Sequence, residues 1–178
     1  MNAVVRSARP DDRAGWAELR SRLWPHCPPA RHRLEINQLL AGEGVVAVAE
    51  AKGILVGFAE ASIRSDHVEG TTTVPVAYLE GWYVVEAHRR RGIGRALLAF
   101  VEEWARKRGH TELASDAEIG DEGGIRLHSV LGFKEVGRSV HFVKPIIASG
   151  PNHLPDPSST YVTPPAGAGG APPSSEDN

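Results

Sequence analysis

The chain has 178 residues, 41% of them hydrophobic, and a formal net charge of −2, which suits one globular domain with a core of its own. This balance of charge does not favour nucleic acid or a membrane surface as a partner. No apolar run approaches the roughly 18 residues of a membrane span, and the N-terminus lacks the apolar segment of a signal peptide. The single cysteine, Cys27, excludes an intrachain disulfide framework and a CxxC zinc site. We therefore expect a cytoplasmic protein.

The composition changes near Ser149. Residues 149–178 contain seven of the chain's 13 prolines and no lysine or arginine. Such a segment cannot bury enough apolar surface to offset the entropy lost on ordering. We therefore expect a folded domain over residues 1–148 and a disordered, Pro/Gly/Ser-rich tail over residues 149–178. A linker is the plainest interpretation of this tail, and a partner-binding segment is the alternative.

Hydrophobic periodicity predicts the elements of the N-terminal half. Residues 2–8 form a short strand, and a helix begins at Pro10 with apolar residues at helical spacing. Prolines break this helix, and a second amphipathic helix covers residues 30–41. Two strands, 45–51 and 54–66, flank a turn that contains Lys52-Gly53.

The C-terminal half alternates strands and helices. A long strand covers residues 74–85, a helix follows over 92–108, a strand over 111–117 and a helix over 122–131. Residues 134–145 form a closing strand or a pair of strands. Because strands and helices intermingle around a largely antiparallel middle, we predict an α+β fold with a mixed sheet.

The stretch "HRRRGIGRALL" joins the long strand to the helix that follows it. Gly92 and Gly94 allow a positive φ or a close approach to the backbone. The first N–H groups of a helix have no internal partner and carry partial positive charge, which suits a pyrophosphate. A solvated turn is the alternative. The stretch is neither a P-loop nor a complete dinucleotide fingerprint.

The motif "RRRGIG", with "LEGWYVVEAHR" before it and "RLHSVLGFKEVG" after it, resembles the GCN5-related N-acetyltransferase (GNAT) family over residues 1–145. The ordered motifs "SRLWP", "EASIRSDHVEGT", "ASDA" and "HSVLGF" are similar to those of its aminoglycoside 6'-N-acetyltransferases. The resemblance implies the GNAT fold: a mixed, mostly antiparallel sheet flanked by helices, with strands that splay apart at the acetyl-CoA site. It also implies direct acetyl transfer from acetyl-CoA to an amine, and a homodimer formed through the C-terminal strands.

The same resemblance implies how acetyl-CoA is held. Backbone N–H groups at the start of the helix meet the pyrophosphate, arginines add charge, and the strand backbone pairs with the pantetheine arm as an added strand. Plain strand packing is the alternative for Tyr83 and Val84. Asp121 stands where the family often has an asparagine, and its carboxylate is a poorer donor. The implied cofactor-binding residues are Trp82, Tyr83, Val84, Arg89, Arg90, Arg91, Gly92, Ile93, Gly94, Arg95 and Asp121.

Three residues are candidates for catalysis. Glu80 interrupts an apolar strand, where a half-buried carboxylate can act as a base; a solvent-facing carboxylate is the alternative. Asp116 is the second carboxylate, which binds the ammonium groups of the substrate, or else an ordinary turn aspartate. His128 replaces the tyrosine of many family members and can protonate the leaving thiolate, unless it only packs.

Trp24 and His67 complete the substrate-binding set with Glu80 and Asp116. The resemblance implies that Trp24 offers its ring to a sugar, although a lone tryptophan at a helix end is more often a core residue. His67 stands where relatives often have a tyrosine beside the substrate. The histidine spacings contain no metal-binding pair such as HExxH, so we predict no metal.

Three functions are consistent with these residues. The first is acetyl transfer to the 6'-amine of aminoglycoside antibiotics, which confers resistance. The second is the same chemistry on another cationic amine or a protein N-terminus. The third is a CoA-binding module without catalytic activity, since fold alone does not fix function.

Overall fold

A five-stranded sheet forms the centre of the protein in the computed structural model, which describes residues 3–42 and 44–146. The strand order is β1-β2-β3-β4-β5, with three antiparallel pairs followed by a parallel pair of β4 and β5. The mixed, mostly antiparallel sheet predicted from the sequence is therefore confirmed. The strands are β1 (Val4–Ser7), β2 (Val45–Ala51), β3 (Ile54–Arg64), β4 (Val76–Val84) and β5 (Leu113–Ser115).

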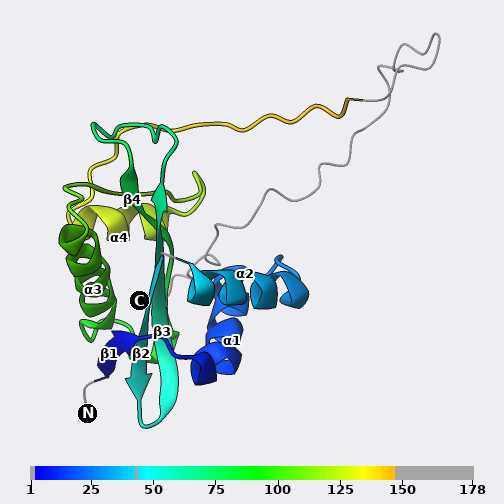
Figure 1. The fold of residues 1–178 in the computed structure, drawn as a ribbon, viewed down its shortest axis with the longest axis vertical. Helices are drawn as coiled ribbons and strands as arrows, with labels where there is room; N and C mark the ends of the chain where they lie inside the picture. Colours follow the sequence, from blue (N-terminus) through cyan, green and yellow to red (C-terminus); the bar gives the residue numbers. More distant parts are fainter. Residues whose placement is uncertain (1–2, 43, 147–178) are drawn as a thin grey trace, which may run out of the picture.

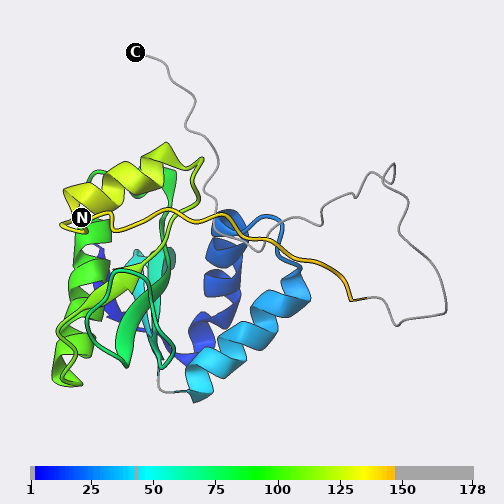
Figure 2. The ribbon, with the colours of Figure 1, turned by 90° about the horizontal axis from the view of Figure 1, so that it is seen from above.

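Helices cover both faces of this sheet. Helices α1 and α2 lie on one face, and α3 and α4 lie on the other (Figures 1 and 2). Among the described residues, no helix is both long and apolar enough to cross a membrane. The helical elements are the 3-10 turn η1 (Pro10–Asp12), α1 (Arg13–Leu23), α2 (Pro29–Ala41), the 3-10 turn η2 (Glu86–His88), α3 (Ile93–Lys107) and α4 (Glu122–Val130).

The alternation of the strands creates two apolar layers. One layer lies between the sheet and α3, whose apolar residues recur at helical spacing, and includes Leu79, Leu97 and Val101. The other layer lies between the sheet and α1 and α2, and includes Trp16 and Phe58. A polar strand residue that faces α1 and α2 must therefore have a hydrogen-bond partner or line a cavity.

The prediction of a closing strand over residues 134–145 is wrong: these residues form no strand in the structure of a single chain. No described residue after Val130 belongs to a strand or helix, and the segment runs out from the body of the fold (Figure 1). A strand needs a hydrogen-bonded neighbour, and this segment has none within the described chain. Its apolar side chains are consequently exposed, Phe142 to 93% and Ile146 to 98%. The predicted tail over 149–178 lies outside the described residues.

The sheet opens between β4 and β5. The two strands pair only from Ala77 with Leu113 to Leu79 with Ser115, and beyond Leu79 no described strand pairs with β4 on that side. This divergence matches the splayed strands expected from the resemblance. It leaves the C-terminal half of β4 with one open edge, next to the start of α3.

Candidate active site

Glu80 reaches the α1–α2 side of the sheet because β4 carries an extra residue there. Ala61 of β3 lies opposite Leu79 and Glu60 lies opposite Gly81, so Glu80 has no partner in the register. A bulge turns two successive residues toward the same side. Both Glu80 and Gly81 thus face α1 and α2, and a Cβ on Gly81 would lie 2.4 Å from the ring of Trp24.

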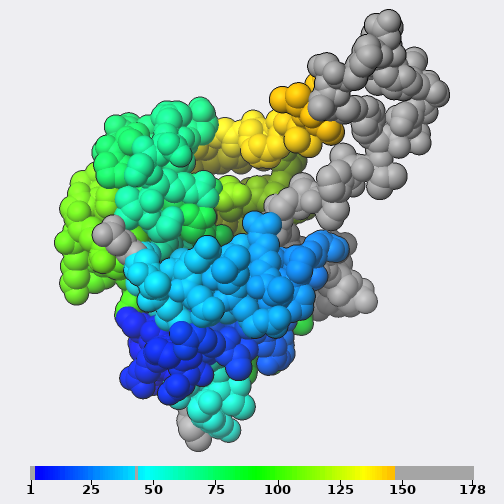
Figure 3. Space-filling view, turned by 45° about the vertical axis from the view of Figure 1, so that its right-hand side comes forward, coloured from blue at the N-terminus to red at the C-terminus, as the bar shows by residue number. Residues whose placement is uncertain are grey.

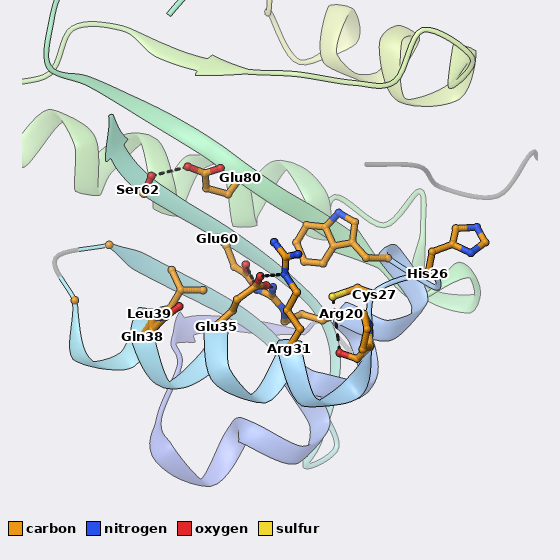
Figure 4. Close-up of a pocket in the computed structure, with 14 residues that line it drawn as sticks. Arg20, His26, Cys27, Arg31, Glu35, Gln38, Leu39, Glu60, Ser62 and Glu80 are labelled. Carbon is orange, nitrogen blue, oxygen red and sulfur yellow. Dashed lines mark hydrogen bonds and ion pairs between the residues drawn. The ribbon is translucent and has the colours of Figure 1, made fainter. Parts of the chain in front are cut away.

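The Glu80 carboxylate is held by two residues of β3. Ser62 donates from Oγ to Oε1 at 2.6 Å (Figure 4), and Arg64 donates from Nε to Oε1 at 3.1 Å and from Nη2 to Oε2 at 2.6 Å. The Glu80 side chain retains 29% exposure. It therefore remains open to a ligand, as the sequence-based prediction requires.

Asp116 lies next to Glu80 because it follows β5 directly. Leu79 lies opposite Ser115 in the parallel pair, so Asp116 continues β5 beside Glu80. The hydroxyl of Tyr78 donates to Oδ1 of Asp116. Burial, and then the bond to Asp116, raises the pKa of Tyr78 above its ordinary value, so this phenol stays protonated and remains a donor.

The Glu80 carboxylate borders a cavity of about 760 Å³. Its walls come from α1, α2, the turn between them, and the strands β3 and β4 (Figure 4). On the outside of the molecule, α2 (light blue) lies below the connection between β3 and β4 (teal) (Figure 3). The side chains that line the cavity include Trp24, Glu35, Glu60, Ser62 and Glu80. The cavity therefore combines an aromatic wall with several carboxylates, which suits a cationic ligand.

A buried ion pair supports the floor of this cavity. Arg20 pairs with both Glu60 and Glu35, and the indole of Trp16 donates to Glu60 at 2.6 Å. Complete burial raises the pKa of Glu60 to about 7, against the opposing effect of Arg20. Sequence analysis missed Arg20 and Glu60. Strand alternation carried a signal, because residues 60, 62 and 64 are polar and share one face of an otherwise apolar strand.

Trp24 belongs both to the core and to the cavity. Its side chain is 8% exposed and packs against Phe58, and the Arg20 guanidinium lies 4.5 Å from its ring centre. It also lines the cavity, so its core packing is compatible with the expected contact with a sugar, which stays a prediction. His67, in contrast, lies in the exposed connection between β3 and β4 with its side chain 72% exposed.

One group near the cavity offers three potential metal ligands within the described residues: Cys27, His32 and Glu35 lie within 4.8 Å of one another. However, Arg20 already pairs with Glu35 and donates from Nε to Nδ1 of His32 at 3.3 Å. A guanidinium at this position repels a second cation. We assign no metal to this group.

On the other side of β4, the start of α3 has the geometry of an anion site. Gly92 precedes the helix with a φ of +78°, in the left-handed region that favours glycine. The backbone N–H groups of residues 92–95 have no acceptor within the helix, because the first intrahelical bond runs from Ala96 to Gly92. Arg91 and Arg95 beside them are exposed.

Glycine is needed at position 94 for a different reason than at position 92. A Cβ on Gly94 would lie 2.7 Å from Cζ2 of Trp82, so glycine allows α3 to pack directly on that indole. The indole also meets the imidazole of His128 edge-on, with ring centres 6.3 Å apart. Trp82 therefore fixes the distance between β4, the start of α3 and α4.

The open edge of β4 carries backbone groups of alternate residues. Val85 donates to the carbonyl of Val56, which places the hydrogen-bonded pairs with β3 at Val85 and Tyr83. Trp82 and Val84 consequently turn their N–H and C=O groups toward the open edge, although the carbonyl of Val84 accepts from Nε of Arg89 at 3.0 Å. The backbone of Tyr83 faces β3, so packing is the role that the register leaves to this residue.

His128 lies at the point where β4 and β5 separate. Its Nδ1 is 2.7 Å from the carbonyl of Gly124, which can only accept, so Nδ1 carries a proton. Its Nε2 is 3.1 Å from Oγ of Ser115, which also lies 3.2 Å from the carbonyl of Leu79. The imidazole is thus oriented toward the opening and can deliver a proton there when both of its nitrogens are protonated.

Asp121 has a structural role that the sequence analysis did not assign. It is the N-cap residue of α4, and its Oδ1 accepts from the backbone N–H of Gly124 at 2.9 Å. This capping bond accounts for an aspartate at the position where the family often has an asparagine. The expected contact of Asp121 with the cofactor stays a prediction.

Comparison with known proteins identifies the class. The sequence profile of the acetyltransferase (GNAT) family matches residues 5–133, and the chain belongs to this family. It is therefore an N-acetyltransferase that uses acetyl-CoA, and the open edge of β4 beside the free N–H groups of α3 fits a pantetheine arm and its pyrophosphate.

The chain is also similar to particular members of the family. It is 45% identical over 145 residues to an aminoglycoside N(6')-acetyltransferase type 1 of Stenotrophomonas maltophilia, which covers 80% of this chain and 94% of that protein. A protein of the same name from Serratia marcescens is 42% identical over 136 residues, covering 75% of this chain and 93% of that protein.

Solved structures agree with these relatives. AAC(6')-Iy in complex with the bisubstrate analogue CoA-S-monomethyl-acetylneamine matches with a TM-score of 0.78 and 33% identity, over 82% of this chain and all of that chain. The aminoglycoside antibiotic 6'-N-acetyltransferase AAC(6')-IG from Acinetobacter haemolyticus matches with a TM-score of 0.77 and 38% identity, over 80% of this chain and 99% of that chain.

Proposed function

We propose that this chain transfers the acetyl group of acetyl-CoA to the 6'-amine of aminoglycoside antibiotics, and that this reaction confers resistance. The observation that carries the proposal is the place of Glu80 in the wall of the cavity, with Asp116 following β5 next to it at the edge where β4 and β5 separate. Carboxylates there suit a substrate with several ammonium groups. The names of the similar proteins support the same substrate class and the same position of acetylation.

Glu80 is the proposed general base. An ammonium group must lose a proton before its nitrogen can attack the acetyl carbonyl, and a carboxylate within hydrogen-bond reach accepts that proton directly or through water. Ser62 supports this role because it fixes Oε1 of Glu80 while the side chain remains partly exposed.

Asp116, Trp24 and His67 make up the rest of the proposed substrate site. The bond from Tyr78 engages Oδ1 of Asp116, so Oδ2 is the oxygen that we assign to a substrate ammonium. Trp24 offers the edge of its ring to a sugar from the cavity wall. His67, whose side chain is 72% exposed, contacts the substrate from the connection between β3 and β4 in this proposal.

Acetyl-CoA binds between β4 and α3 in this proposal. The N–H groups of residues 92–95 receive the pyrophosphate, and Arg90, Arg91 and Arg95 add positive charge. Trp82 and Val84 offer backbone groups to the pantetheine amides, since the register turns these groups outward. Arg89 acts through the loop, where it holds the carbonyl of Val84.

His128 is the proposed acid for the leaving thiolate. It lies at the fork of the sheet, and the carbonyl of Gly124 orients its ring. Protonated on both nitrogens, the imidazole gives the Nε2 proton to the sulfur and returns to the neutral form.

A homodimer in the cytoplasm is the proposed working form. The exposed apolar side chains of residues 136–146 support a second copy as the partner, because the described part of one chain leaves them largely uncovered: Val136, Val140, Phe142, Val143 and Ile146 are between 56% and 98% exposed. The cytoplasmic location is supported by the demand for acetyl-CoA and by the free thiol of Cys27.

A paired assay tests the proposed function. Purified protein is incubated with acetyl-CoA and either kanamycin A, which has a 6'-amine, or a close analogue with a 6'-hydroxyl, and release of free CoA thiol is followed. We expect release with the amine and little with the hydroxyl analogue. Release with neither compound, or a preference for a peptide or simple polyamine in competition, would contradict the proposal.

A further inference from the structure

Arg64 occupies the acceptor site before any substrate enters. It ends β3 on the same face as Ser62, and its guanidinium binds both oxygens of Glu80, with Nε at 3.1 Å and Nη2 at 2.6 Å. The guanidinium also lies over the ring of Tyr78, 3.3 Å from its centre. A cation therefore already lies against the carboxylate that is to receive the substrate amine.

The position of Tyr78 places this cation between the two carboxylates of the site. Its ring carries Arg64 on one face, and its hydroxyl donates to Asp116. Ser62, Glu80, Arg64, Tyr78 and Asp116 thus form one continuous chain of contacts. Oε1 of Glu80 accepts from both Ser62 and Arg64, and Oε2 accepts from Arg64, so an acceptor ammonium at Glu80 competes with the guanidinium for these oxygens.

Exchange of the two cations is physically easy. The Arg64 side chain is 42% exposed and that of Glu80 29% exposed, so the pair is partly solvated rather than sealed in the core. Pairs of this kind contribute little net free energy. Glu80 does not depend on Arg64 for its position, because Ser62 holds the same carboxylate independently.

We propose that Arg64 is an internal counter-ion that substitutes for the substrate ammonium in the free enzyme and is displaced by it on binding. This inference rests on the proposed function, since it takes Glu80 as the acceptor carboxylate. Arg64 is then a specificity-determining residue: an acceptor enters only by presenting a cation that exchanges for the guanidinium. A neutral analogue leaves Arg64 on Glu80.

Removal of the counter-ion should tighten acceptor binding. Arg64→Met replaces the guanidinium with a neutral side chain of similar length. The Kd of kanamycin A is measured by calorimetry, by titration into the full-length chain without acetyl-CoA. We expect this Kd to fall about two- to fivefold in Arg64→Met, which is the range of a partly exposed ion pair. The KM for kanamycin A should fall with it. The kcat should stay within twofold, because Ser62 still holds Glu80. Arg64→Lys, which keeps the charge but not the two-point contact, should lie between Arg64→Met and the unmodified protein.

Arg31→Met is the control, because Arg31 lines the cavity and, like Arg64, pairs with a carboxylate, here Glu35. It removes one positive charge from the cavity that Glu80 borders, without removing a contact of Glu80. An equal gain in affinity in this control would reduce the effect to general electrostatics and overturn the proposal. An unchanged or higher Kd in Arg64→Met would overturn the proposal too. So would a failure of kanamycin A to bind either Arg64→Met or the unmodified protein. Because the titration needs no turnover, failure of acetyl transfer in the unmodified protein would count against the proposed function alone.

Discussion

One extra residue in a strand gives this protein its candidate base. Without the bulge at Glu80, alternation along β4 would put either Glu80 or Gly81 on the α3 side of the sheet. With it, the carboxylate and the glycine that accommodates Trp24 face the same cavity. The sequence showed that a carboxylate interrupts an apolar strand. It could not show the bulge, because the register depends on contacts with β3.

The first prediction concerns Glu80 itself. Glu80→Gln keeps the size and the bond from Ser62 but removes the base, so we expect kcat to fall about 10²- to 10⁴-fold with little change in thermal stability. Steady-state kinetics with kanamycin A and acetyl-CoA measure this effect. Glu103→Gln, on the exposed face of α3, is the control and should leave kcat unchanged. A loss of less than tenfold in Glu80→Gln would remove Glu80 from the role of base.

The second prediction concerns the buried carboxyl of Glu60, whose pKa burial raises to about 7. In the unfolded chain this carboxyl titrates near 4.5. Between these values the folded protein binds more protons than the unfolded chain, so Glu60 makes the free energy of unfolding decrease as pH rises from about 4.5 to about 7.

Urea denaturation of the full-length chain at several pH values tests this sign, with Glu60→Gln as the reference, because the difference between the two proteins cancels the other titrating groups. The free energy of unfolding of the unmodified protein relative to Glu60→Gln should decrease through this window. A difference that increases with pH would mean that the pair with Arg20 keeps Glu60 ionised throughout.

At the scale of elements, β4 is the wall shared by the two halves of the site. Its α1–α2 face carries Glu80 and Gly81, and its opposite face carries Trp82 against Gly94 of α3. Each glycine permits one tryptophan to approach the neighbouring backbone. The two positions should therefore separate acceptor binding from acetyl-CoA binding.

The third prediction follows from this separation. In Gly81→Ala the new Cβ would lie 2.4 Å from Trp24, and in Gly94→Ala it would lie 2.7 Å from Trp82. Overpacking of this kind costs about 1–3 kcal/mol. We expect Gly81→Ala to raise the KM for the aminoglycoside several-fold and Gly94→Ala to raise the KM for acetyl-CoA several-fold. Gly120→Ala, which meets no atom within 4 Å, should change neither value. The same KM change in both variants would refute the separation.

Local sequence signals predicted the elements well where each element makes its own core contacts. The 3.6-residue rhythm of α3 and the apolar alternation of β3 and β4 are such signals, and the structure has these elements within two residues of the expected ends. Residues 134–145 have the same alternation but form no strand, because pairing, unlike periodicity, needs a neighbour. Arg64 and Arg20 escaped notice for a related reason: their partners are distant in sequence.

At the scale of the molecule, residues 134–146, which belong to no strand or helix of the described structure, support the proposed assembly. Phe142 is 93% exposed, whereas the apolar residues of α3 are buried. Burial of such side chains in an interface contributes roughly 25 cal/mol per Å², so we expect a second copy of the chain to cover them, as proposed above.

The fourth prediction tests this assembly. By light scattering after gel filtration, the full-length chain should have the mass of a dimer and Phe142→Asp the mass of a monomer. Ile54→Asp is the control, because Ile54 is also exposed, to 68%, but begins β3 and is far in sequence from residues 134–146. This variant should leave the dimer intact. A monomeric unmodified protein would remove the proposed dimer without affecting the site within one chain.

The central claim is that Glu80 and Asp116 direct a 6'-amine to the opening of the sheet where acetyl-CoA is bound. The most direct measurement is the position of the new acetyl group in the product of kanamycin A and acetyl-CoA, determined by NMR. We predict a single product acetylated on the 6'-nitrogen. An acetyl group on another amine, or no product at all, would contradict this account of the site.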